Sequence, residues 1–185
     1  VLFRSESGAS QPSLPKLDYI ARRLGVPAYS LMPDFSALPP AYLELKYQIL
    51  REPIYGKEEE YDKKEACLEE IEDLFYEQLP NEEKIWFEAT RATIDVIRSG
   101  RPEYGETVLD DYFKTIYDKE LFLINELEVI NLYFAIVLTK IKQGQNQIEE
   151  INRIHSFLVR LTNHVELIAP EYLFALSNTL FSGLA

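Results

Sequence analysis

Residues 129–138 read Val-Ile-Asn-Leu-Tyr-Phe-Ala-Ile-Val-Leu, and they form the longest apolar run in the chain. Asn131 interrupts this run, which is about half as long as the ~20 residues that a membrane-spanning helix needs. The run belongs to a longer helical segment, which we expect Asn125 to cap and which ends near Lys142, before Gly144. A helix that is apolar around most of its circumference must be covered on several sides. This stretch therefore predicts the middle of a stack of helices.

Apolar residues recur at helical spacing along the rest of the chain, and no segment alternates like a half-buried strand. Further helices are expected over residues 14–24, 41–51, 57–78, 81–100, 103–117, 147–163 and from Pro170 toward Phe181. The starts fall into two series, and each series advances by about 45 residues. Two helices per unit at a fixed interval are typical of an α-solenoid. The predicted fold class is all-α with degenerate repeats, and a plain helical bundle is the alternative.

Composition and charge exclude several classes of protein. The 185 residues carry a net charge of −12, with +2 on residues 1–32 and −14 on the remainder. An acidic body repels phosphates, so it argues against binding nucleic acid with that body, although such a charge can also serve solubility alone. The single cysteine, Cys67, excludes an internal disulfide framework and favours a reducing compartment. With no membrane span and no secretory leader in the sequence, we predict a cytoplasmic protein without a membrane partner.

Both ends of the sequence favour a fragment of a longer protein. It begins with Val1 rather than methionine, and residues 1–5 are set aside as foreign to the fold. It ends at Ala185 without the polar last helix that usually caps a solenoid. We therefore expect that C-terminal repeat units are missing or that this end meets a partner.

The N-terminal pattern carries the first resemblance to a known family. Residues 6–14, Glu-Ser-Gly-Ala-Ser-Gln-Pro-Ser-Leu, are followed by Leu17, Ile20-Ala21 and Leu24-Gly25-Val26-Pro27. This pattern resembles the back end of an XRE-type helix-turn-helix domain. There, a Pro-Ser-Leu cap starts the fourth helix, and the Ile-Ala and Leu-Gly pairs lie on its packed face. The resemblance implies that Ser10 contacts the DNA backbone. The recognition helix is absent, so this chain is not expected to read a DNA sequence by itself.

A second set of motifs extends the resemblance over the rest of the chain. These motifs are Glu52-Pro53-Ile54-Tyr55, Leu68-Glu69-Glu70-Ile71, Leu79-Pro80 with Glu82-Glu83, and Asn125 with Val129-Ile130 and Tyr133-Phe134. In this order and spacing they resemble the Rgg, PlcR and PrgX group of peptide-pheromone receptors of Gram-positive bacteria, and within it the ComR-like competence regulators.

The resemblance implies a quorum-sensing transcriptional regulator built from a helix-turn-helix domain and a right-handed solenoid of tetratricopeptide-like helical hairpins. Residues 6–32 would be the C-terminal part of the DNA-binding domain, 33–40 a linker, and 41–185 an incomplete peptide-sensing domain. A short signalling peptide would bind the repeat domain and shift the protein toward a homodimer that binds DNA.

Lys64 is the first candidate for binding such a peptide. It stands in the otherwise apolar row of its expected helix, between Tyr61 and Leu68. By the resemblance it matches a lysine that lines the peptide pocket, where an ammonium group would pair with a peptide carboxylate. Alternatively, its stem lies on the core and its ammonium stays in water. An arginine of the family's pocket falls on Gly56, with Lys57 adjacent, so either the charge has moved by one residue or the ligand differs.

Asn131, Asn178, Tyr133 and Trp86 are the remaining candidates for peptide contacts. The carboxamide of Asn131 can serve a peptide backbone as donor and acceptor, or it can satisfy a carbonyl of a neighbouring helix. Asn178, on the last expected helix, has the same chemistry. Tyr133 and Trp86 can shape pockets for apolar anchors, although aromatic residues at helical spacing also belong in cores.

No arrangement of residues in the sequence predicts catalysis. His155 and His164 lack the spacing of metal ligands, and His155 is expected in the core. There is no glycine-rich phosphate loop, zinc-binding helix or nucleophile elbow, and the acidic surroundings of Cys67 disfavour a thiolate. We therefore predict no metal, no cofactor and no enzymatic activity. The leading prediction is a peptide-responsive transcriptional regulator, and the alternative is a helical-repeat scaffold that binds another protein without controlling DNA.

Overall fold

The computed structural model of the protein describes residues 14–24, 31, 38–52, 56–117, 119, 122–145, 148–162 and 176–179. These residues form helices and no strands: α2 (Leu14–Leu24), α3 (Pro40–Arg51), α4 (Glu58–Leu74), the 3-10 turn η2 (Tyr76–Gln78), α5 (Asn81–Ser99), α6 (Glu103–Ile116), α7 (Ile124–Lys142) and α8 (Ile148–Thr162). Residues 176–179 are also helical. The all-α prediction is confirmed. The segment 57–78 is not one helix, because α4 ends at Leu74 and η2 follows.

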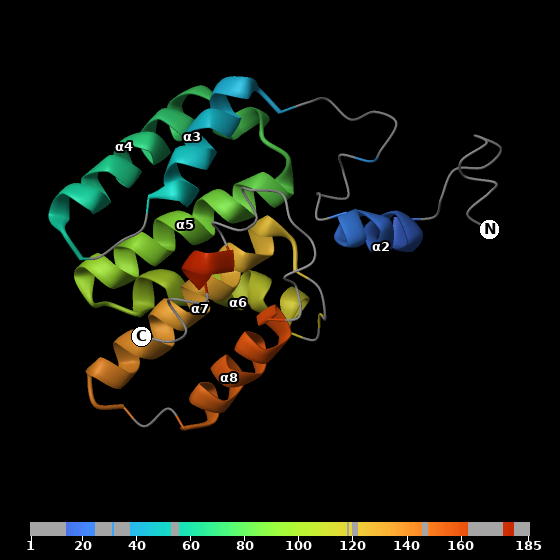
Figure 1. Cartoon of the computed structure of the whole chain (residues 1–185). Coiled ribbons are helices and arrows are strands. Elements are labelled where there is room, and N and C mark those ends of the chain that lie inside the picture. Colours follow the sequence, from blue (N-terminus) through green and yellow to red (C-terminus); the bar gives the residue numbers. More distant parts are fainter. Residues whose placement is uncertain are drawn as a thin grey trace.

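The helices pack in the order expected of a two-helix repeat. α5 packs on both α6 and α7, and α6 in turn packs on α7. In the same way α3 packs on α4, and α4 packs on α5. Figure 1 shows these helices following one another from α3 and α4 at the top to α8 at the bottom. The starts of α4, α6 and α8 are 45 residues apart. This stacking of successive hairpins favours the helical repeat over a plain bundle.

Helix α7 lies at the centre of the stack, as its apolar sequence predicts. Every residue from Leu127 to Val137 is buried, and the helix packs on α5, α6 and α8. Aromatic rings join three of these helices, since the ring of Phe113 on α6 lies 4.5 Å from Tyr133 on α7 and 5.7 Å from Phe157 on α8, centroid to centroid. Such spacings are those of favourable aromatic pairs.

A buried polar network ties α3 to both α5 and α7. Lys46 Nζ donates hydrogen bonds of 2.6 Å to Glu83 Oε2 and to Asn125 Oδ1. The Tyr42 hydroxyl donates to the same Glu83 oxygen at 2.5 Å, and Asn125 Nδ2 donates to Glu83 Oε1 at 3.1 Å. The Lys46 ammonium also lies 4.7 Å from the ring centroid of Trp86. We call these five residues the Lys46 network.

The expected helix cap at Asn125 is wrong. The capping position is Leu123, whose backbone N–H donates to the Glu126 carboxylate at 2.8 Å. Glu126 therefore satisfies the start of α7 and leaves the Asn125 side chain to the Lys46 network. An acidic side chain in the first turn can do this because it both accepts the hydrogen bond and faces the positive end of the helix dipole.

Helix α6 approaches its neighbours closely at Gly105. A Cβ atom at this position would lie 2.7 Å from Leu132 Cδ1 and 3.0 Å from both Ile136 Cδ1 and Val96 Cγ2. The absence of a side chain thus lets α6 contact both α5 and α7. The packing of α6 on these two helices offsets the cost of placing a glycine inside a helix, which is about 1 kcal/mol relative to alanine.

Two expectations about helix faces are wrong. His155 is exposed rather than in the core. The buried residues of α8 are Ile154, Phe157 and Leu161. Helix α8 carries two rows of apolar residues, and the row that contains Phe157 faces the core. The Phe157 ring packs there against the aromatic residues of α6 and α7.

On α2, Leu17 and Ala21 are buried as expected, but Leu24 is 61% exposed. Ser13, His164, Pro170 and Phe181 lie outside the described residues.

We predict that Glu83→Ala destabilises the protein strongly. The substitution leaves the Lys46 ammonium and the Tyr42 hydroxyl buried without their carboxylate, and breaking a buried pair in this way costs about 3–5 kcal/mol. Urea unfolding followed by circular dichroism measures this loss. Glu72→Ala is the matched control, because it removes an ion pair with Arg91 in which the side chains are 49% and 38% exposed. That loss should stay below about 1 kcal/mol. Equal losses in the two variants would contradict the importance of the Lys46 network.

We also predict that Gly105→Val lowers the free energy of unfolding by about 1–3 kcal/mol, because overpacking forces neighbouring side chains out of place. Thr107→Val introduces the same side chain at an exposed position of the same helix. It should change stability by less than about 0.5 kcal/mol. Thermal or urea unfolding of both variants would show whether the close approach of α6 depends on glycine.

Candidate functional site

Two predicted peptide-binding residues, Lys64 of α4 and Asn131 of α7, are buried, and so is Glu128, also of α7. Their residues are 7%, 8% and 9% exposed, respectively. Asn131 Nδ2 donates to Glu128 Oε2 at 3.5 Å. Lys64 and Glu128 act on each other's pKa through their charges, although no ion pair joins the two side chains. We call these three residues the Lys64 cluster.

The Lys64 ammonium is buried, which excludes the alternative in which it stays in water. Lys64 Nζ donates a hydrogen bond of 2.6 Å to the Ile49 carbonyl, near the C-terminal end of α3. Burial lowers the pKa of Lys64, and the attraction of Glu128 and Glu52 opposes this effect. An ammonium group has three donors. Among the described residues Lys64 makes one hydrogen bond, so two donors remain for another group.

Glu128 and Asn131 are incompletely satisfied. The 3.5 Å contact between them is at the outer limit of a hydrogen bond. The Oδ1 atom of Asn131 is buried and has no partner among the described residues. Burial raises the pKa of Glu128, and Lys64 and Asn131 oppose this effect. A buried acceptor without a partner costs about 1–3 kcal/mol, so these groups are suited to receive donors from a ligand.

Residues 176–179 flank the Lys64 cluster from the C-terminal side of the chain. Asn178 Nδ2 donates to the Leu50 carbonyl at 2.8 Å, next to the carbonyl that Lys64 binds. Thr179 Oγ1 donates to the Leu127 carbonyl at 3.4 Å, next to Glu128 in the chain. Figure 1 shows this short helical segment in red in front of α7. Asn178 therefore lies beside the cluster without belonging to it.

The other predicted site residues lie elsewhere. Trp86 is fully buried in the Lys46 network, where its Nε1 has no hydrogen-bond partner among the described residues. Tyr133 is part of the aromatic core, and its hydroxyl donates to Glu150 Oε2 at 2.5 Å. Lys57 is exposed, immediately before α4, and its backbone N–H donates to Glu60 Oε2 at 3.2 Å. Ser10 lies outside the described residues. Among the predicted residues, Asn131 is thus joined to Glu128 by a hydrogen bond and Lys64 is influenced by its charge, whereas Lys57 is exposed.

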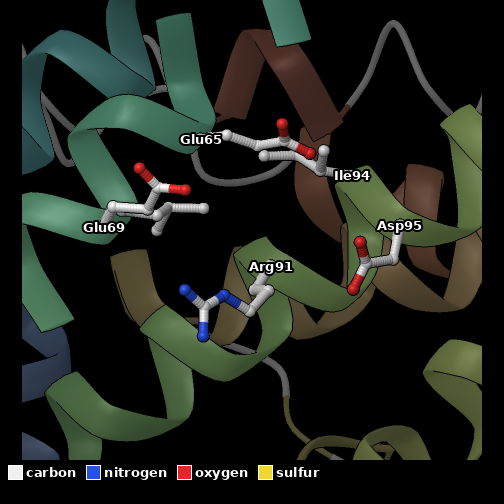
Figure 2. Close-up of a pocket in the computed structure, with 6 residues that line it drawn as sticks. Glu65, Glu69, Arg91, Ile94 and Asp95 are labelled. Atoms are coloured by element: carbon white, nitrogen blue, oxygen red, sulfur yellow. The ribbon is translucent and has the colours of Figure 1, made fainter. Parts of the chain in front are cut away.

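A pocket of about 250 Å³ lies between α4 and α5. Figure 2 shows Glu65 and Glu69 of α4 opposite Arg91 and Asp95 of α5, with Ile94 beside them. Arg91 is held by Glu72 through hydrogen bonds of 2.9 and 2.6 Å. Burial raises the pKa of Asp95, and Glu65 adds to this effect. The acidic rim makes this pocket unsuited to a peptide carboxylate, and no predicted site residue lines it.

Glu128 was not among the residues predicted from the sequence. It directly precedes the apolar run, and it stands three residues before Asn131 on the same face of the helix. That spacing was a usable signal, because a carboxylate next to a run of buried residues is rarely left without a partner.

The described residues contain no group of acidic, histidine and cysteine side chains that could hold a metal. None of the described helices is long and apolar enough to span a bilayer.

Comparisons with known proteins cover nearly the whole chain. The family model of the ComR tetratricopeptide matches residues 39–185. A comparison with curated protein sequences gives no match. Among solved structures, ComR from Streptococcus suis is similar, with 37% identity and a TM-score of 0.60 over 98% of this chain and 57% of that chain.

Two further solved structures were determined with bound ligands. ComR from S. thermophilus, in complex with DNA and its signalling peptide ComS, has 28% identity and a TM-score of 0.63, over 98% of this chain and 60% of that one. ComR from Streptococcus vestibularis, in complex with its cognate signalling peptide XIP, has 30% identity and a TM-score of 0.58, over 98% and 59%. The chain thus spans less than two thirds of the length of these regulators.

The buried Glu128 gives a prediction about pH. Because burial raises its pKa, the folded state binds more protons than the unfolded state above pH ~4.5, so this residue contributes stability that is lost as the pH rises through the folded-state pKa. We expect Glu128→Gln to be progressively more stable than the unmodified protein as the pH increases from 5 to 8. Urea unfolding of both proteins at pH 5 and at pH 8 measures the difference in their free energies of unfolding. Glu70→Gln, at an exposed position of α4, is the control and should not change the pH dependence.

Proposed function

From the premise that the chain belongs to the ComR tetratricopeptide family, we propose that it is the peptide-sensing part of a transcriptional regulator of competence. A short signalling peptide binds the repeat domain in the cytoplasm and controls dimerisation and DNA binding by the full-length protein. Support comes from the S. thermophilus relative, which was solved with DNA and a signalling peptide, and from the S. vestibularis relative, which was solved with XIP.

The observation that carries this proposal is the Lys64 cluster. It supplies an ammonium with free donors, a carboxylate and an unpartnered carboxamide oxygen, and all three side chains are buried. A peptide backbone offers N–H donors to Asn131, and a terminal carboxylate offers acceptors to Lys64. Charge-assisted hydrogen bonds in a buried site are the strong ones, so these few groups can orient a peptide whose apolar side chains supply the rest of the affinity.

A second contact supports control of the DNA-binding domain by the repeat domain. Arg22 of α2 donates to the Glu126 carboxylate of α7 at 3.0 and 3.3 Å, and Lys119 pairs with the same carboxylate. Glu126 stands two residues before Glu128 on α7. A ligand that shifts α7 at the Lys64 cluster would therefore also shift the partner of Arg22. Such a peptide favours one arrangement of the two domains only if it binds that arrangement more tightly.

Isothermal titration calorimetry with synthetic XIP, the peptide named for the S. vestibularis relative, tests the proposed function. Binding at micromolar concentration or tighter, about −8 kcal/mol, is expected. Lys64→Met should weaken binding at least tenfold, because it keeps the apolar stem and removes the ammonium. Lys63→Met, at the neighbouring exposed position, is the matched control and should bind like the unmodified protein.

The possible outcomes separate the two candidate functions. An equal affinity in the Lys64→Met variant would overturn the role of Lys64 and leave peptide sensing intact. A folded protein that gives no heat with XIP would favour the alternative, a helical-repeat scaffold without a role in DNA regulation. Circular dichroism of each variant shows whether it is folded.

A further inference from the structure

Two cations share the carboxylate of Glu126, in the first turn of α7. This carboxylate accepts hydrogen bonds of 3.0 and 3.3 Å from Arg22 of α2, and it forms an ion pair with Lys119, which lies between α6 and α7 in the chain. The backbone N–H of Leu123 donates to it as well, at 2.8 Å. The charged side chains are partly buried, with exposed fractions of 16%, 15% and 27% for Arg22, Glu126 and Lys119. Water therefore screens their charges only in part.

This sharing sets the two cations against each other. Like charges repel, so Arg22 and Lys119 each pair less strongly with Glu126 than either would alone. The carboxylate does not need Lys119 to keep its orientation, because the N–H of Leu123 already holds it in the capping arrangement at the start of α7. The presence of Lys119 thus weakens the contact between α2 and α7.

The position of Lys119 depends on Arg160 of α8. Arg160 Nη1 donates to the Tyr117 carbonyl at 2.7 Å and to the Lys119 carbonyl at 2.8 Å. The guanidinium group lies 4.3 Å from the ring centroid of Phe157 and 5.6 Å from that of Phe122. Both rings are buried in the core, so Arg160 is anchored where it binds the two carbonyls. Helix α8 therefore keeps Lys119 within reach of the shared carboxylate.

We propose that Lys119 competes with Arg22 for Glu126, and that Arg160 is the positioning residue that keeps Lys119 in this competition. The strength with which the stack holds α2 then depends on the position of α8. A movement of α8 that withdraws Lys119 leaves Glu126 to Arg22 alone and tightens the contact with α2. The regulatory meaning of this device rests on the proposed function, in which α2 belongs to the DNA-binding domain that the repeat domain controls.

Hydrogen–deuterium exchange of the whole chain, followed by mass spectrometry, tests the competition through the amides of α2. An 11-residue helix is marginally stable by itself in water, so the protection of its amides reports the contacts that hold it. Lys119→Met is expected to slow exchange in α2 by about two- to fivefold, the range of a partly screened ion pair. Lys142→Met, at an exposed position of α7, removes the same charge and should leave exchange in α2 unchanged.

Glu126→Gln removes the charge for which the two cations compete. Exchange in α2 should become faster in this variant, because Arg22 loses its carboxylate. The glutamine carbonyl can still accept from the N–H of Leu123, so the start of α7 stays capped. Exchange in α7 and α8 shows, for each variant, whether the stack is intact.

Two further variants test the role of Arg160. Arg160→Met removes the donor for the two carbonyls, and Lys119 then spends less time beside Glu126, because ordering a lysine side chain costs entropy. Exchange in α2 should therefore slow, by less than in Lys119→Met. The variant with both substitutions should exchange like Lys119→Met alone, because Arg160 acts through the lysine and the two effects do not add.

The contradicting results are distinct. If Lys119→Met accelerates exchange in α2 or leaves it equal to the control, or if Glu126→Gln does not accelerate it, the competition is overturned. If the effects of Lys119→Met and Arg160→Met add, Arg160 acts by another route and its positioning role is overturned.

The proposed function and this inference can fail separately. Binding of XIP by a chain in which Lys119→Met changes nothing would keep peptide sensing and overturn the competition at Glu126. The expected exchange pattern in a chain that gives no heat with XIP would keep the competition and overturn its link to peptide sensing.

Discussion

The ion pair between Lys46 and Glu83 holds the first hairpin of the repeat domain against the rest of the stack. Lys46 stands on α3, Glu83 on α5 and their shared neighbour Asn125 on α7, so one ammonium group links three helices. The two charges are 2.6 Å apart and nearly inaccessible to water. A buried pair of this kind contributes little net stability compared with an apolar equivalent, but it permits few alternative arrangements. We infer that it fixes the register of α3.

That register positions the candidate site. The C-terminal end of α3 presents the Ile49 carbonyl to Lys64 and the Leu50 carbonyl to Asn178. Lys64 thus binds the C-terminal end of α3, and the Lys46 network holds that same helix against α5 and α7. Helix α7 completes the arrangement, because Asn125 belongs to the Lys46 network while Glu128 and Asn131, one and two turns further along, belong to the Lys64 cluster. Polar groups of the Lys46 network and of the candidate site therefore share one helix.

A polar side chain that interrupts an apolar row in the sequence is a useful sign of a buried polar group. Lys64 between Tyr61 and Leu68, and Asn131 within 129–138, are such cases, and both are buried. Their part in peptide binding stays a prediction. Prediction was poor where two rows of similar hydrophobicity compete, as on α8, where His155 is exposed. It was also poor for Glu128, because a single sequence does not reveal whether a glutamate at the edge of an apolar run turns inward. Lys57 stands beside the position that the family resemblance indicated, and yet the structure leaves it exposed.

The sequence by itself determined the helices, their two series of starts and the central position of α7, because helical periodicity, caps and breakers act over a few residues. The tertiary structure alone decided which charges are paired. Lys46 and Asn125 are 79 residues apart in the chain, and Lys64 and Glu128 lie on helices separated by a full repeat. The ionic state of a buried group depends on every neighbour that packing brings to it, and no local pattern contains that information.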